Sequence, residues 1–132
     1  RGMNSSPPHC PQIREEVLRD RRFPVHTIAD QLLPYLQVLV GQFHPDQVIL
    51  FSSHAYGEPT SDSDVDLLIV KSIQEGRVKD KVAIRRAWWP LLVGRFPLSF
   101  DLLLMTPQEF AAICPQASGY HAEIFRKGLR VA

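Results

Sequence analysis

Two aspartates separated by one residue, Asp64 and Asp66, are the side chains whose type and spacing most clearly suggest chemistry. They stand at the start of an apolar run. Side chains two apart on a strand point to the same face, so the two carboxylates are expected side by side. Neighbouring carboxylates repel, and burying them requires a compensating cation. A hard divalent ion with oxygen ligands, above all Mg²⁺, suits this arrangement. The alternative interpretation is a solvated turn before the strand.

Two other kinds of metal site are disfavoured. An EF-hand loop beginning at Asp62 would need Gly after its third acid and Glu at its last position, where this chain has Leu67 and Ile73. A zinc site is not expected, because Cys10 and Cys114 lie far apart, form no CxxC pair, and the histidines are scattered.

A serine-containing loop precedes the acid pair. Ser52 and Ser53 follow the apolar run at residues 48–51 and lead into a short helical segment around residues 55–57. Backbone N–H groups and the positive end of such a segment suit a phosphate. A divalent metal beside a phosphate-binding loop predicts phosphoryl or nucleotidyl transfer.

A third acid, Asp101, lies among apolar residues in the run at residues 98–105. A lone acid inside a buried strand is costly unless it is paired or bound to metal. Asp101 is therefore predicted to be the third carboxylate beside Asp64 and Asp66. The alternative is an acid that faces water on an edge strand.

Three short apolar runs position these residues. Residues 48–51, 65–70 and 98–105 are rich in branched apolar side chains and bounded by turn formers, which predicts buried strands. The first two are joined by a loop that contains Gly57 and Pro59.

The order of these residues resembles a known family. Ser53, a spacer at residues 54–63 and the Asp64-Val65-Asp66 triplet are similar to the nucleotidyltransferase core of the DNA polymerase β superfamily, whose pattern is Gly-Ser, a spacer and Asp-x-Asp. The amino-acid sequence of this segment most resembles that of minimal nucleotidyltransferase (MNT) domains, and the resemblance covers about residues 28–131. Ser52 departs from the pattern, because the family has Gly there. The implied fold is α/β, a small mixed twisted sheet with helices packed mainly on one side.

The resemblance also implies roles for the residues. The expected reaction is metal-dependent transfer of AMP from ATP to a hydroxyl. Asp64 and Asp66 would hold two Mg²⁺ ions that bridge the triphosphate, and Asp101 would hold the catalytic ion and help to deprotonate the acceptor. Ser52 and Ser53 are the expected nucleotide-binding residues, with Ser53 and loop N–H groups gripping the β- and γ-phosphates.

Partners follow from the same resemblance. Larger relatives, such as aminoglycoside nucleotidyltransferases, carry a helical domain for their acceptor, and this chain is expected to act without one. Minimal domains are often paired with a helical HEPN protein, a toxin RNase, which they neutralise by adding AMP to a tyrosine. The expected function is therefore that of an antitoxin in a toxin–antitoxin pair, a protein adenylyltransferase with a nucleoside triphosphate and a HEPN-like protein as partners. Homo-oligomerisation is left open.

Two rival functions are weighed against this one. A catalytically impaired MNT-fold subunit could neutralise a partner by covering it, and Ser52 motivates this alternative. If the position needs a positive φ, a Cβ there costs roughly 1–2 kcal/mol and crowds the phosphate. Nucleotidyl transfer to a small molecule such as an antibiotic is a weaker alternative, because no acceptor domain is expected.

Length and composition set the outer limits. The 132 residues suggest a mobile segment at residues 1–11 and a single domain at residues 12–132. A net charge of +1 gives no strong field for nucleic acid or membrane. No apolar run approaches the roughly 18 residues of a membrane span, and no signal-peptide pattern opens the chain. A reduced, cytoplasmic protein is the default.

Helical patterns fill the rest of the chain. The first covers residues 12–22; the second covers residues 27–43, with Thr27 as N-cap and either a kink or a fresh helix start at Pro34. The third covers residues 77–93. A fourth helix is expected to begin at residue 107, with a capping box formed by Thr106 and Glu109. A fifth is expected at residues 118–127, with Gly128 as its C-cap and a short extended piece after it.

In the third helix, Val78, Val82, Trp89 and Leu92 form the expected inward stripe, and Pro90 is expected to break or kink the end. Adjacent helical residues point about 100° apart. One of Trp88 and Trp89 is therefore expected in the core and the other partly exposed.

Overall fold

The computed structural model describes residues 12–60, 62–94, 97–113, 124 and 126–132. The expected mobile segment at residues 1–11 lies outside these residues. The elements in chain order are α1 (Glu15–Leu18), a 3₁₀ helix η1 (Pro24–Ile28), α2 (Ala29–Phe43), β1 (Gln47–Phe51), α3 (Ser53–Tyr56), β2 (Val65–Val70), α4 (Arg77–Ala87), α5 (Trp89–Leu92), β3 (Phe100–Met105), α6 (Pro107–Ile113) and β4 (Leu129–Arg130). None of the helices in these described ranges has the length and apolarity needed to cross a membrane.

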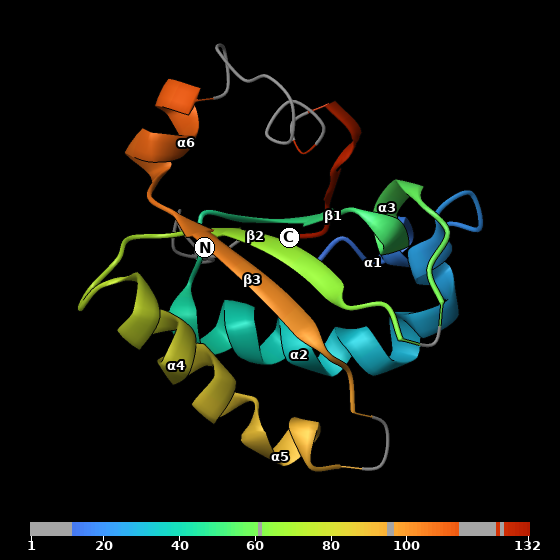
Figure 1. The fold of residues 1–132 in the computed structure, drawn as a ribbon, viewed down its shortest axis with the longest axis horizontal. Coiled ribbons are helices and arrows are strands. Elements are labelled where there is room, and N and C mark those ends of the chain that lie inside the picture. Colours follow the sequence, from blue (N-terminus) through green and yellow to red (C-terminus); the bar gives the residue numbers. More distant parts are fainter. Residues whose placement is uncertain (1–11, 61, 95–96, 114–123, 125) are drawn as a thin grey trace, which may run out of the picture.

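The strands form one mixed sheet in the order β3-β2-β1-β4 (Figure 1). β1 pairs antiparallel with β2 and with β4, whereas β2 and β3 are parallel. Parallel neighbours need a crossover connection, which α4 and α5 supply here. The predicted mixed α/β sheet is confirmed, and the three predicted strands are all present.

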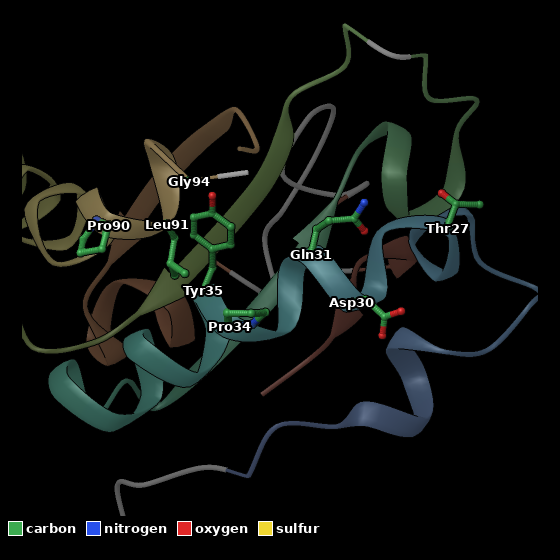
Figure 2. A pocket seen from close by; sticks show the side chains of 8 residues that line it. All are labelled: Thr27, Asp30, Gln31, Pro34, Tyr35, Pro90, Leu91 and Gly94. Atoms are coloured by element: carbon green, nitrogen blue, oxygen red, sulfur yellow. The ribbon is translucent and has the colours of Figure 1, made fainter. Parts of the chain in front are cut away.

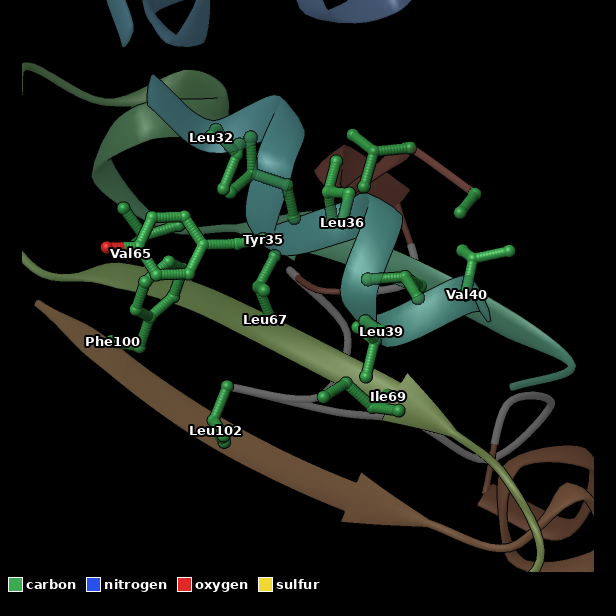
Figure 3. Close-up of a cluster of buried hydrophobic side chains, with 14 of the residues drawn as sticks. Leu32, Tyr35, Leu36, Leu39, Val40, Val65, Leu67, Ile69, Phe100 and Leu102 are labelled. Carbon is green, nitrogen blue, oxygen red and sulfur yellow. The ribbon is translucent and has the colours of Figure 1, made fainter. Parts of the chain in front are cut away.

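The larger core lies between α2 and one face of the sheet. Side chains alternate between the two faces of a strand, so Val65, Leu67 and Ile69 of β2 share one face. They pack against a stripe of α2, and all the side chains involved are buried (Figure 3). The residues of that stripe are Leu32, Tyr35, Leu36 and Leu39.

The second face of the sheet carries a smaller cluster, which includes Phe51, Leu68, Val70 and Met105. Phe110 of α6 packs against its edge. Figure 1 shows α2, α4 and α5 on one side of the sheet and α6 on the other. The expectation that the helices pack mainly on one side is therefore confirmed.

An aromatic cluster fixes the start of β3. The rings of Tyr35, Trp88 and Phe100 are mutually in contact, with centroid distances between 4.5 and 5.3 Å. The Trp88 indole N–H donates to the Tyr35 carbonyl at 2.9 Å, and the Leu98 N–H donates to the Tyr35 hydroxyl at 3.3 Å. Because Phe100 precedes Asp101, this cluster also sets the position of that acid.

The start and interior of α2 differ from the prediction. Thr27 is not its N-cap, because it lies in η1 and its hydroxyl donates to the Pro24 carbonyl at 3.0 Å. Ile28 precedes the first residue of α2 instead. The helix continues through Pro34 without a fresh start, so the buried stripe compensates for the hydrogen bond that proline removes.

The inward stripe predicted for α4 is wrong. Val78, Val82 and Trp89 are exposed, whereas the buried side chains of α4 are Asp80 and Ile84. Asp80 faces inward because it accepts hydrogen bonds from the Lys71 ammonium group at 3.1 Å and from the Gln74 N–H at 2.9 Å. One tryptophan is buried and one is exposed, as expected, but Trp88, outside the expected stripe, is the buried one.

The remaining predictions have mixed outcomes. The first helix covers only Glu15–Leu18 rather than residues 12–22. The capping box of α6 is confirmed, because the Glu109 N–H donates to the Thr106 hydroxyl at 3.1 Å and the Thr106 N–H donates to the Glu109 carboxylate at 3.0 Å. The extended piece after Gly128 is confirmed as β4. Most of the helix predicted at residues 118–127 lies outside the described residues.

Candidate active site

The junction between β1 and α3 holds Ser52 in an unusual backbone conformation. Its φ is 67° and its ψ is −145°, close to a region that is occupied almost only by glycine. The Ser52 carbonyl accepts the N–H groups of Ala55 at 3.0 Å and Tyr56 at 3.1 Å, which closes the turn into α3. A residue held in such a conformation costs of order 1–3 kcal/mol and persists where the surroundings impose it.

Asp66 and Asp101 lie next to each other on adjacent parallel strands. They are register partners, each the second residue of its strand. Register partners point to the same face, and here it is the face that carries the smaller apolar cluster. On its other side, Asp66 pairs with Phe51 of β1, which is the residue before Ser52. The sheet therefore brings Ser52, Asp66 and Asp101 together.

The electrostatics of Asp66 show this proximity. Its partial burial raises the pKa of the carboxyl, and repulsion from Asp101 raises it further. A hydrogen bond from the Ser52 side chain lowers the pKa, and the charge of Asp64 raises it again, with a net increase. The carboxyl also forms a hydrogen bond with Asp101. A pair of carboxyl groups in contact shares a proton or needs a cation.

The outer two acids are both exposed. Asp64 is exposed and immediately precedes β2. Asp101 is also exposed and lies on β3, an edge strand of the sheet, which is the alternative that the sequence left open. The expectation that Asp101 is buried inside its strand is therefore wrong, and the cost of burial does not explain this residue. Its position beside Asp66 is what connects it to the site.

The donor atoms fit a hard divalent cation. Asp66 and Asp101 offer carboxylate oxygens that repel each other, which is the chemistry that Mg²⁺ neutralises. Nevertheless, the described residues contain no group of three or more Asp, Glu, His or Cys side chains arranged as a metal site. Asp64 is close enough for its charge to raise the pKa of Asp66, and its role as a third ligand stays a prediction.

Ser53 is the first residue of α3 and is partly buried. Next to it lies His54, whose burial was not predicted. His54 is only 6% exposed, and neither ring nitrogen makes a regular hydrogen bond within the described part of the chain. Burial lowers the pKa of His54, and the nearby Ser63 backbone partly offsets this. A histidine between two small residues gave no sequence signal of its burial.

A contact that the sequence did not predict places the Lys127 ammonium group beside α3. The Lys127 ammonium group lies 5.6 Å from the centroid of the Tyr56 ring, within the range of a cation–π contact. Lys127 precedes β4, which pairs with β1, so the sheet topology places the end of the chain beside α3. The two residues are far apart in the sequence, and no local pattern could have joined them.

A cavity of about 600 Å³ lies elsewhere, between α2 and the segment around α5 (Figure 2). Tyr35, Pro34 and Leu91 contribute its apolar walls, while Asp30 and Gln31 contribute polar groups. None of the predicted site residues lines it. The cavity is therefore separate from the acid pair.

Residues 30–127 match the family model described as "Nucleotidyltransferase domain". The chain belongs to the nucleotidyltransferase domain family. The matched region contains Ser52, Ser53, Asp64, Asp66 and Asp101. A comparison with curated proteins finds no match.

Membership of the nucleotidyltransferase family supports a general activity. Such domains transfer a nucleotidyl group from a nucleoside triphosphate, generally with the help of a divalent metal. The mixed sheet and the helices of this chain agree with the nucleotidyltransferase fold. The acceptor is a separate question, which family membership does not answer.

Proposed function

We propose that this nucleotidyltransferase domain transfers AMP from ATP to a hydroxyl group of a partner protein. The observation that carries the proposal is the contact between Asp66 and Asp101 beside the strained backbone of Ser52. Paired carboxyl groups next to a tight polar turn suit a triphosphate whose charge is neutralised by metal.

Asp64, Asp66 and Asp101 are the proposed ligands of two Mg²⁺ ions, which when bound supply charge neutralisation for the triphosphate and for the departing pyrophosphate. Ser52 and Ser53, with the backbone N–H groups of their turn, are proposed to bind the phosphates. The acceptor oxygen forms a bond to the α-phosphorus as the bond to the bridging oxygen breaks. Asp101, exposed at the sheet edge, accepts the proton of the acceptor hydroxyl.

The exposure of this end of the site favours a large acceptor. Asp101 lies on the edge strand and is open to solvent, so a tyrosine on the surface of another protein could reach it. We propose a HEPN-type toxin as that protein, which would make this chain the antitoxin. Transfer of AMP to a tyrosine hydroxyl would then inactivate the partner.

The test is the stoichiometry of modification. A small amount of this protein, with ATP and Mg²⁺, should add one nucleotide mass or more to a large excess of the HEPN-type product of an adjacent reading frame. The Asp64→Asn variant should lose this activity and still bind the partner. Intact-protein mass spectrometry measures both. A partner that stays unmodified and is neutralised equally by parent and variant would refute the proposal.

Ser52 supports one second candidate, a binding subunit without transferase activity. Its positive φ is the conformation for which glycine is favoured, and a Cβ at this position would crowd a phosphate bound to the turn. Such a subunit would neutralise its partner only at equal stoichiometry and without ATP. The same titration therefore separates the two candidates.

A further inference from the structure

All the large hydrophobic side chains that are exposed in the described ranges come from α4, α5 and the residue after them. Val78 is 76% exposed, Val82 46%, Trp89 62% and Val93 59%. Val78 and Val82 lie four residues apart on α4, and Trp89 and Val93 lie four residues apart at the start and just past the end of α5, so the members of each pair are neighbours on one helix face. We call them the α4–α5 stripe. Val82 and Trp89 line the same groove, and exposed apolar side chains gathered in this way mark an interaction site.

A groove runs beside the stripe. It has a volume of about 410 Å³ and is lined by Val82, Trp89 and Leu92 together with Arg85 and Arg86. Apolar side chains form its floor and two guanidinium groups border it. A groove of this composition accepts protruding apolar side chains and pairs with acids next to them.

Most charged side chains of α4 are cations, and one of them, Arg77, is paired with Glu109 of α6. α4 contains a single acid, Asp80, and this carboxylate is buried against Lys71 at 3.1 Å. Every other charged side chain of α4 is a cation, and each is exposed or partly exposed: Arg77, Lys79, Lys81, Arg85 and Arg86. The surface therefore combines exposed apolar side chains with flanking positive charge.

We propose that the α4–α5 stripe and its groove bind an amphipathic helix of another protein, with acidic residues flanking its apolar face. Apolar side chains at helical spacing would enter the groove beside Trp89, and carboxylates would pair with Lys79 and Arg86. A second copy of this chain is disfavoured, because a symmetric contact would bring the same cations together. A lipid surface has no side chains that would fill the groove.

The position of this surface relates it to the candidate active site. The Arg85 guanidinium donates to the Phe100 carbonyl at 2.9 Å, which ties the end of α4 to the residue before Asp101. A helix bound on the stripe would thus lie on the element that is fastened to the strand of Asp101. Binding itself does not depend on nucleotidyl transfer, so this proposal and the proposed function can fail separately.

The experiment is a selection from two displayed helix libraries against the full chain. Both libraries contain helices of about 16 residues, which match α4 and α5 in length at ~1.5 Å per residue. Both vary the apolar face, but one carries Asp and Glu at the flanking positions and the other carries Lys and Arg. The acidic library should yield binders and the basic library should not. Binders from both libraries, or from neither, would overturn the proposal.

Variants then locate the binding. Trp89→Ser combined with Val82→Ser should raise the Kd of a selected helix about 30-fold, as loss of a buried interface tryptophan does. Arg86→Glu should also weaken binding. Arg21→Glu, which changes the net charge equally in an exposed turn far along the chain, should not. Equal affinities for Arg86→Glu and Arg21→Glu, or for parent and double-serine protein, would contradict the proposed surface.

Two further measurements test whether a second copy of this chain or a lipid surface covers the α4–α5 stripe. Sedimentation of the parent and of the double-serine protein should show the same species. A dimer that only the parent forms would mean that a second copy covers the stripe. Neither protein should bind equimolar phosphatidylserine–phosphatidylcholine vesicles. Vesicle binding that depends on Trp89 would mean that the stripe is a lipid-binding surface, and either result would refute the helix proposal.

Discussion

At the scale of single residues, Ser52 combines a backbone conformation that favours glycine with a hydrogen bond from its side chain to Asp66. Ser52→Gly should relieve the strained backbone and raise the free energy of unfolding by about 1 kcal/mol, since relief of ~1–3 kcal/mol exceeds the added entropy of an unfolded glycine. Ser52→Ala keeps the strain and loses the hydroxyl, so it should not be more stable than the parent. Urea denaturation measures the three proteins. If Gly and Ala gave equal stabilities, the strain would be absent.

Asp66 is the residue whose ionisation should respond to metal. Burial and the neighbouring Asp101 raise its pKa above the ordinary 3.8, so the folded protein holds this proton more tightly than the unfolded chain. Stability from this group is therefore gained as pH falls through the raised pKa toward 3.8, and lost as pH rises. In EDTA at neutral pH, Asp66→Asn should melt at a higher temperature than the parent.

Divalent metal should reverse that order. Saturating Mg²⁺ or Mn²⁺ at 100 times its Kd should stabilise the parent by about 2.7 kcal/mol. The protein with both Asp64→Asn and Asp66→Asn should not respond. Thermal melts in EDTA and in metal measure this difference. An equal shift in parent and double variant would show that the ions bind elsewhere.

At the scale of elements, the orientation of α4 depends on the buried ion pair between Lys71 and Asp80. Burial alone would raise the pKa of Asp80, but the N–H groups of Gln74 and Glu75, which donate to its carboxylate, and the Lys71 ammonium group outweigh burial and lower this pKa. Asp80→Asn would leave Lys71 buried and unpaired, which should cost about 3–5 kcal/mol. The lowered pKa also means that stability from Asp80 is lost as pH falls below 3.8.

A matched control uses the same substitution in an exposed ion pair. Asp30 bonds to Arg19 at 2.9 Å, with both side chains largely open to solvent. Asp30→Asn should therefore cost only about 0.2–1 kcal/mol. Chemical denaturation of the two variants compares them directly. Similar losses for Asp30→Asn and Asp80→Asn would show that the buried pair does not hold α4 in place.

At the scale of the whole molecule, local patterns predicted the strands and the capping box of α6, because alternation and capping act over a few neighbouring residues. The exposure of Asp101 was the alternative that the sequence left open, since only the strand order makes β3 an edge. The face of α4 that points inward depends on the contact between Asp80 and Lys71, which cannot be predicted from helical periodicity. The conformation of Ser52 follows from the β1–α3 turn, where the family pattern alone pointed to glycine.

The central claim is that this molecule transfers a nucleotidyl group through the acids gathered at Asp66 and Asp101. The most direct measurement incubates the protein with Mg²⁺, the proposed HEPN-type partner and ATP that is labelled at either the α- or the γ-phosphate. Nucleotidyl transfer predicts that the α-label alone enters the partner and that Asp66→Asn abolishes this. Incorporation of the γ-label, or the same α-label incorporation by parent and Asp66→Asn, would contradict the account.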